Sequence, residues 1–226
     1  MLGADTRRLE RMAGRGEIPC QKIGGRFRFN RAAITQWLQQ TMTTMDGGNL
    51  AQVDAGMIAH RQARRDEAVV GPLLRIEAVA ADLESRTKNS TLRDLVALAE
   101  RTGLVYDAPE IVQAVLCREQ LCSTAMPGGI AIPHPQRPLP YAVAEPILVV
   151  ARTCQGIVFG APDGRLSQLF FLTVSQDDRH HVHVLARLCR ILHHEPLIEQ
   201  LRYAETAEEM IELIRERELQ IISQST

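Results

Sequence analysis

Hydrophobic positions divide the chain into a sparse N-terminal part and a dense C-terminal part. From about residue 71 onward, continuous apolar runs at 147–151 and 169–174 have the length and composition of strands buried on both faces. Around them, apolar residues recur at helical spacing in segments that begin near Thr91, Pro109 and Thr206, and also along 184–192. Strands that alternate with helices predict an α/β domain of roughly 150 residues.

The first 41 residues predict a smaller unit made of a helix, a hairpin and a second helix. Asp5 can cap a short helix over 6–13, and Gly24-Gly25 between two short arms is the signal for a two-residue hairpin. We expect three apolar side chains of the arms to face inward: Ile23, Phe27 and Phe29. Asn30 can cap the second helix, which carries apolar residues at helical spacing: Ile34, Trp37 and Leu38.

Charge is distributed unevenly along the chain. The 226 residues have a formal net charge of −1, but residues 1–41 carry eight Lys or Arg side chains against three acids, a net charge of +5. Such an asymmetry between segments indicates a contact with nucleic acid or another polyanion. Six basic residues are the candidates for DNA contact: Arg7, Arg8, Arg11, Lys22, Arg26 and Arg28.

Composition excludes several classes of protein. The longest apolar runs are strand-sized, far short of a membrane span, and no apolar segment near Met1 indicates a signal peptide. The five cysteines are an odd number without C-x-x-C spacing, so neither a disulfide framework nor a zinc ribbon is indicated. We therefore expect reduced thiols, a cytoplasmic location and no membrane partner.

The segment from Lys22 to Leu38 closely resembles the excisionase-type members of the MerR-like winged helix-turn-helix group. It has their Gly-Gly turn, their alternation of basic and aromatic residues, and the capped helix that follows. The resemblance implies that the helix over 5–13 is the recognition helix and that Gly24-Gly25 is the tip of the wing. That group has a further helix before the recognition helix, so we expect a unit that is truncated or has lost it.

The most informative chemistry lies in the stretch 117–134. Gly128 and Gly129 allow the backbone to approach a ligand closely, and His134 directly follows a rigid Ile-Pro strand end. A neutral imidazole is a competent nucleophile, and a nearby arginine can hold a phosphoryl group with two hydrogen bonds. The chemistry alone leaves His134 as a nucleophile, a general base or a structural histidine.

A second group of histidines opens the helix predicted around 184–192. It consists of His180, His181 and His183, with His193 and His194 expected later on the same helix. There is no H-E-x-x-H pattern and no carboxylate between the histidines, so exposed imidazoles at a helix start are favoured over a metal site. We expect neither a metal nor another cofactor.

Together, the two histidine segments resemble the type-2 enzyme IIA domain of the phosphoenolpyruvate:sugar phosphotransferase system, in its fructose/mannitol and nitrogen-regulatory branch. The run from Arg118 to His134 resembles the signature R-E…S-T…G-(I/V)-A-(I/V)-P-H, and 181–186 resembles H-L-x-x-L-A. The resemblance implies a mixed sheet flanked by helices. It also implies that His134 accepts a phosphoryl group from an HPr-type phosphohistidine carrier. His181 would hydrogen-bond the phosphoryl oxygens, and Arg118 would supply positive charge.

Several neighbouring residues keep two interpretations. Ser123 and Thr124 either donate hydrogen bonds to the phosphoryl group or form a local cap, and His180 is the register alternative to His181. His183 is expected to point to a different side of the helix. The chain departs from the family pattern at 125–127, where Ala-Met-Pro replaces Gly-Ile-Gly.

These patterns predict a two-domain regulator with an excisionase-like unit over 1–41, a linker over 42–70 and an enzyme IIA-like domain over 71–226. With a DNA-binding unit in place of a sugar permease, regulation is favoured over sugar uptake. Phosphorylation of His134 is then expected to alter DNA or partner binding. One alternative is a phosphate-independent DNA-binding regulator that uses the enzyme IIA fold for protein binding. Another is a phosphocarrier whose N-terminal unit binds nothing. A homodimer is an option, because operator-binding units often act as dimers.

Overall fold

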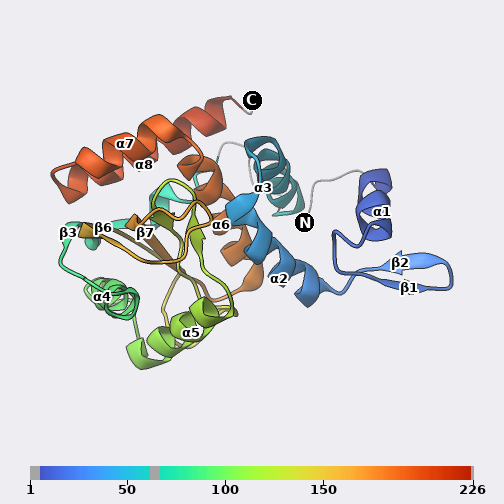
Figure 1. Cartoon of the computed structure of the whole chain (residues 1–226), viewed down its shortest axis with the longest axis horizontal. Coiled ribbons are helices and arrows are strands. Elements are labelled where there is room, and N and C mark those ends of the chain that lie inside the picture. The colour runs from blue at the N-terminus through green and yellow to red at the C-terminus, as the bar shows by residue number, and fades with distance from the viewer. Residues whose placement is uncertain (1–5, 62–66, 225–226) are drawn as a thin grey trace.

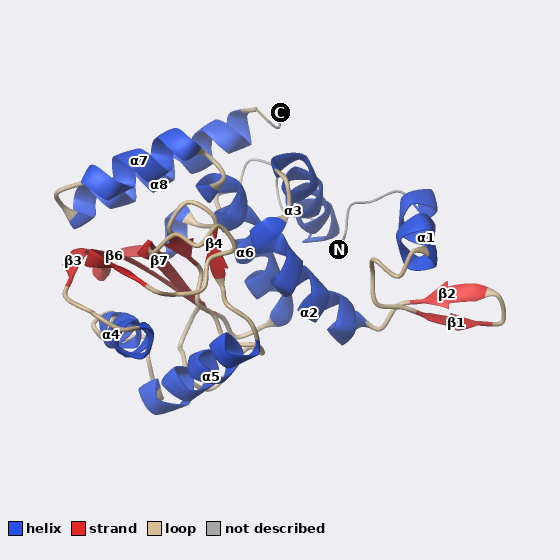
Figure 2. Cartoon of the chain, in the orientation of Figure 1, coloured by secondary structure: helices blue, strands red, loops and turns tan. Residues whose placement is uncertain are grey.

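The computed structural model describes residues 6–61 and 67–224, which form a layered α/β body with a smaller N-terminal unit beside it (Figure 1). The first helix and a two-stranded hairpin project from one end of the molecule (Figure 2). Among the described residues, none of the helices combines the length and apolar character needed to span a bilayer.

The body is built on a mixed five-stranded sheet in the order β3-β6-β7-β5-β4. The pairs β3/β6 and β7/β5 are parallel, whereas β6/β7 and β5/β4 are antiparallel. The strands are β3 (Leu74–Leu83), β4 (Ala125–Met126), β5 (Ile130–Ala131), β6 (Ile147–Ile157) and β7 (Ser167–Val174). The predictions of strands at 147–151 and 169–174 are confirmed.

Helices cover both faces of this sheet. On one face lie α4 (Lys88–Glu100) and α5 (Ala108–Leu121), and on the other lie α6 (Asp178–Leu192), α7 (Glu195–Tyr203) and α8 (Ala207–Ser223). Alternate residues of β6 enter the two cores: Leu148 and Val150 pack with α6–α8, and Val149 packs with α4 and α5. Burial on both faces explains the continuous apolar composition of this strand.

The N-terminal unit has the predicted order of elements. They are α1 (Thr6–Gly14), β1 (Gln21–Ile23), β2 (Arg26–Arg28), α2 (Arg31–Thr41), the 3-10 helix η1 (Met42–Thr44) and α3 (Gly47–Arg61). Gly24 and Gly25 have φ angles of 56° and 78°, the left-handed values that a two-residue hairpin turn requires. Asn30 Oδ1 accepts a hydrogen bond from Ala33 N at 3.2 Å, which confirms the cap of α2. The predicted cap at Asp5 lies outside the described residues.

The hairpin corrects the expected orientation of its apolar side chains. With a two-residue turn, Ile23 faces Arg26 across the ladder, and Lys22 faces Phe27. Cross-strand partners share one side of a hairpin, so Ile23 and Phe27 lie on opposite sides. Only Phe27 packs inward, whereas Ile23 is 60% exposed and Phe29 is 40% exposed.

The segment expected to be a linker contains a helix that packs along α6. The contact face of α3 is formed by Leu50, Val53 and Met57, which are buried in the same core as α6. Asp54, which is fully buried, accepts hydrogen bonds from Arg187 Nε at 2.8 Å and from Arg190 Nη1 at 3.1 Å. The N-terminal unit is thus joined to the body by apolar packing and by buried ion pairs.

The C-terminal end of the expected linker, at residues 69–71, is also attached to the body. The buried carboxylate of Glu218, in α8, accepts hydrogen bonds from the backbone N–H groups of Val69, Val70 and Gly71 at 2.6–2.9 Å. Arg187 Nη1 lies 3.3 Å from Glu218 Oε1 and therefore bridges this anchor to Asp54. Two carboxylates and one arginine thus hold three segments that are distant in the sequence.

Candidate functional site

His134 is held by the backbone that continues from β5. Ile132 N donates to Thr124 O at 3.1 Å, and Thr173 N donates to Pro133 O at 3.0 Å, so the chain on either side of the Ile-Pro step is fixed. His134 Nδ1 lies 2.8 Å from Ile132 O. A carbonyl oxygen can only accept, so Nδ1 carries the proton and Nε2 carries the lone pair. Nε2 is buried and contacts no hydrogen-bonding group in the described part of the chain.

His181 lies beside His134 on the first turns of α6. Asp177 caps this helix through a hydrogen bond from His180 N to Asp177 Oδ1 at 2.9 Å. The ring centroids of His134 and His181 are 5.3 Å apart, with the planes tilted by 53°. His181 Nε2 is also buried without a hydrogen-bond partner among the described residues. The structure therefore brings together two imidazoles with unsatisfied ring nitrogens.

Arg118, on the last turn of α5, supplies a buried positive charge. Its Nη1 donates to Cys122 O at 2.9 Å, and its side chain is 4% exposed. Within residues 6–61 and 67–224, no carboxylate forms an ion pair with Arg118. A buried guanidinium without a counter-ion is a natural partner for an anionic group.

The hydroxyl groups of Ser123 and Thr124 anchor the loop before β4. Ser123 Oγ donates to Phe159 O at 2.6 Å, and Thr124 Oγ1 donates to Glu119 Oε2 at 2.5 Å. Glu119 is in turn paired with Lys88 Nζ at 2.7 Å. Each hydroxyl has one proton and uses it within the protein. Of the two interpretations of these residues, the structure favours the local anchor.

Both imidazoles are neutral at pH 7. Burial lowers the pKa of His134 well below its ordinary value, and electrostatic interaction with the neighbouring His181 and Arg118 lowers it further. Burial, His180 and Arg118 lower the pKa of His181 to about 4, although Asp177 opposes the change. Because only the neutral ring has a free nitrogen lone pair, the site keeps its nucleophile in the reactive form.

These pKa values predict an acid-labile fold. Above pH 6.5, His181 is neutral in both the folded and the unfolded chain. As the pH falls from 6.5 towards 4, only the unfolded chain takes up the proton. The free energy of unfolding should therefore fall by about 3 kcal/mol over this range through His181 alone. Urea unfolding at a series of pH values measures this slope. The slope should become shallower in His181→Gln, because His134 still contributes to it, and should stay close to the wild-type slope in His193→Gln, whose side chain is exposed. Equal slopes in the two variants would contradict the assignment.

The remaining histidines lie outside this pair. His183 Nε2 is 3.4 Å from Asp54 Oδ1, on a different side of α6, as predicted. His193 and His194 are not on α6, contrary to expectation. The helix ends at Leu192, His193 caps its C-terminus, and His194 caps the start of α7. Pro196 in the first turn of α7 explains the break, since proline fits the start of a helix better than its interior.

Five of the six candidate DNA-contacting side chains are exposed. Two of them lie on α1 and three on the hairpin: Arg7, Arg11, Lys22, Arg26 and Arg28. Arg8 is different, because its guanidinium donates to Gln52 Oε1 at 2.6 Å and also to Asn49 Oδ1, both in α3. Arg8 therefore ties the predicted recognition helix to α3.

Sequence analysis missed a polar pair on α2. Thr35 and Gln39 are four residues apart and therefore share one face of the helix with Ile34 and Leu38. Both are buried, and Thr35 Oγ1 and Gln39 Nε2 make no hydrogen bond to any described residue. The alternation of polar and apolar residues on this face was the available signal.

Models of two known families match separate parts of the chain. The model for the phosphoenolpyruvate-dependent sugar phosphotransferase system, EIIA 2, matches residues 72–217, and the model for a helix-turn-helix domain matches residues 1–42.

Individual relatives match the body of the protein. The PTS system fructose-specific EIIA component of Haloferax volcanii is 30% identical over 143 residues, which are 62% of this chain and 91% of that protein. The PTS system fructose-specific EIIABC component of Bacillus subtilis is 27% identical over 148 residues, which are 65% of this chain but only 23% of that protein. The crystal structure of nitrogen regulatory protein IIA-Ntr from Neisseria meningitidis matches with a TM-score of 0.59 and 26% identity, covering 65% of this chain and 99% of that one.

Proposed function

Because the chain belongs to the EIIA type-2 family of the phosphoenolpyruvate-dependent sugar phosphotransferase system and also carries a helix-turn-helix domain, we propose that it is a phosphorylation-responsive DNA-binding regulator. In this proposal, His134 accepts a phosphoryl group from an HPr-type phosphohistidine carrier. The observation that carries it is the buried lone pair of His134 Nε2 beside His181 and Arg118.

The transfer moves one phosphoryl group between two ring nitrogens. The Nε2 lone pair of His134 forms a bond to phosphorus, while the bond from phosphorus to the ring nitrogen of the carrier breaks and returns its electron pair to that nitrogen. His134 keeps its Nδ1 proton, and the Ile132 carbonyl that accepts it stabilises the positive charge that develops in the ring. No proton has to leave His134 during the step.

The neighbouring groups act on the phosphoryl oxygens. Arg118 contributes a fixed positive charge where negative charge is concentrated, and His181 orients the group through its ring nitrogen. Phosphoryl transfer depends mainly on such positioning and charge stabilisation. The exposed basic side chains of α1 and the hairpin would neutralise DNA phosphates, with α1 in the major groove.

The test is phosphoryl incorporation followed by DNA binding. The full chain is incubated with phosphoenolpyruvate, enzyme I and an HPr-type carrier, and mass spectrometry is run under conditions that preserve acid-labile phosphohistidine. We expect one phosphoryl group on His134 in the wild type and none in His134→Gln. DNA selection with each form should then give different affinities at one salt concentration. Incorporation that survives in His134→Gln would refute the site.

A second candidate function is a phosphate-independent regulator that uses the EIIA fold to bind a protein partner. The burial of His134 and His181 favours it, because a buried histidine is poorly accessible to a carrier. DNA binding without phosphoryl incorporation from any carrier would support this alternative.

A further inference from the structure

The N-terminal unit covers the outer side of the helix that carries His181. Residues 181–189 of α6 are all buried. Successive helical residues are rotated by 100°, so nine of them sample every direction around the helix. The sheet covers α6 through β7, α7 and α8 cover a further part of it, and α2, η1 and α3 cover the rest (Figure 1). A body without the N-terminal unit would expose the part of α6 that α2, η1 and α3 cover.

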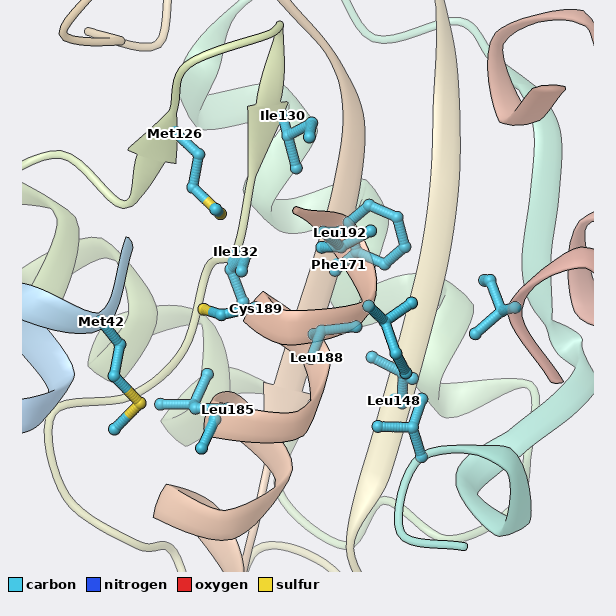
Figure 3. Packing of buried hydrophobic residues seen from close by; sticks show 14 of the residues in the cluster. Met42, Met126, Ile130, Ile132, Leu148, Phe171, Leu185, Leu188, Cys189 and Leu192 are labelled. Carbon is cyan, nitrogen blue, oxygen red and sulfur yellow. The ribbon is translucent and has the colours of Figure 1, made fainter. Parts of the chain in front are cut away.

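The contact reaches the level of the histidines. Met42, in η1, lies beside Leu185 of α6 (Figure 3). His181 precedes Leu185 by four residues and therefore lies one turn away on the same face of α6. Leu38 of α2 is buried in the same core as Met42, and both α2 and η1 contact α6. The segment from α2 to η1 therefore packs on the helix that carries His181.

Four buried polar atoms of the histidine pair and of α2 make no hydrogen bond to any described residue. Nε2 of both His134 and His181 lacks a partner among the described residues, as do Thr35 Oγ1 and Gln39 Nε2 on the buried face of α2. A buried polar atom without a hydrogen bond costs about 1–3 kcal/mol. A permanent interface tends to avoid this cost, whereas a contact that opens has less need to. The cost therefore favours a contact made to be released.

We infer that residues 31–44, here called the cover, shield the phosphoacceptor site, so that the carrier and the cover compete for one face of α6. This inference rests on the proposed function for the identity of the carrier. His134 and His181 are 1% and 2% exposed, and a carrier must bring phosphorus to bonding distance of His134 Nε2. That approach requires the cover to move.

Phosphorylation then acts on the cover in return. A phosphoryl group adds a charge of about −1.5 to −2. It also needs space beside Nε2, so the closed cover and phosphorylated His134 exclude each other. Coupling of this kind is reciprocal: whatever holds the cover closed slows phosphorylation, and phosphorylation releases the cover. Because α2 directly follows the hairpin, release changes how the DNA-binding elements sit on the body.

A matched pair of substitutions tests the cover. Gln39 is buried and Gln40 is exposed, so Gln39→Arg places a charge on the buried face of α2, while Gln40→Arg places the same charge in solvent. Carbethoxylation of His134 and His181 by diethyl pyrocarbonate, located by mass spectrometry, measures access without any carrier. We expect Gln39→Arg to react about 10- to 1000-fold faster than Gln40→Arg, the inverse of an open population of 0.1–10%. Equal rates would overturn the cover.

A reversible disulfide that holds the cover closed provides a second test, which does not depend on whether Gln39→Arg folds. Met42→Cys and Leu185→Cys, combined with Cys189→Ala, place two thiols across the contact, and peptide mapping verifies the disulfide. The oxidised protein should react slowly with diethyl pyrocarbonate and with the phosphorylated carrier, and reduction should restore both rates. Full reactivity in the mapped, oxidised protein would overturn the inference.

The two readouts separate the inference from the proposed function. If the opened variant reacts faster with diethyl pyrocarbonate but never gains a phosphoryl group, the cover stands and the proposed function fails. If the locked protein gains a phosphoryl group as fast as the reduced one, the proposed function stands and the cover fails.

Discussion

Replacement of Asp54 with alanine is expected to lower the free energy of unfolding by about 3–5 kcal/mol. Burial would raise the pKa of this carboxyl, but its contacts with His183 and Arg187 outweigh burial and hold the pKa below its ordinary value. Asp54 is therefore a buried anion. Its removal leaves Arg187, which is 1% exposed, with Glu218 at 3.3 Å as its remaining carboxylate. An incompletely compensated buried guanidinium is costly.

The measurement is urea unfolding at pH 7, monitored by circular dichroism. Glu145→Ala is the matched control, because Glu145 also pairs with an arginine, Arg75 at 2.9 Å, but both side chains are about half exposed. An exposed pair contributes about 0–1 kcal/mol, so the control should unfold almost like the wild type. If Asp54→Ala cost no more than Glu145→Ala, the ion pairs would not hold α3 on the body.

The same residue shows where local sequence patterns stop being informative. Among the described side chains of α3, three apolar residues form the contact face, and Asp54 adds buried ion pairs to Arg187 and Arg190 on α6. Those partners lie more than 130 positions away in the sequence. The local pattern therefore indicates a weak helix in a linker, and the contact that fixes the helix is visible only in three dimensions.

Some strands were predictable from the local sequence pattern, and others were not. Strand β6 is an interior strand whose first five residues are buried, so the apolar run at 147–151 was sufficient to predict that part of it, whereas its continuation to Ile157 was not predicted. Strand β3 is at the sheet edge and its sequence includes exposed charged residues such as Glu77, so it shows neither a continuous run nor a clean alternation. In the hairpin, the turn was predictable. The side of the hairpin on which the Ile23 side chain lies depends on the register that a two-residue turn imposes.

The proximity of His134 and His181 was predictable from the sequence, whereas their burial was not. His134, Arg118 and His181 come from three separate segments, and the two motifs that contain them were sufficient to propose that they meet. The helix that carries His181 is itself packed against α2, which lies about 80 or more positions earlier in the sequence and carries no motif that indicates this contact. A motif identifies chemistry, whereas access to that chemistry is a property of the whole chain.

Replacement of Arg118 with glutamine is expected to slow phosphoryl acceptance by about 10²–10³-fold, the usual loss when one preorganised donor to a developing anion is removed. Glutamine keeps a donor for the Cys122 carbonyl but removes the positive charge. Arg118→Lys restores the charge without the planar fork and should recover part of the rate. The measurement is the initial rate of phosphoryl incorporation at a fixed concentration of phosphorylated carrier.

Arg118 also holds the end of α5 through the Cys122 carbonyl, so a structural loss has to be separated from a loss of charge. The unfolding midpoint in urea and the diethyl pyrocarbonate reactivity of His134 report on the structure. If Arg118→Gln slows phosphoryl incorporation while both stay at wild-type values, the loss belongs to charge at the phosphoryl group. If Arg118→Lys is as slow as Arg118→Gln, charge alone is insufficient and the two-pronged geometry of the guanidinium carries the effect. A wild-type rate in Arg118→Gln would remove Arg118 from the site and leave the two histidines to act without it.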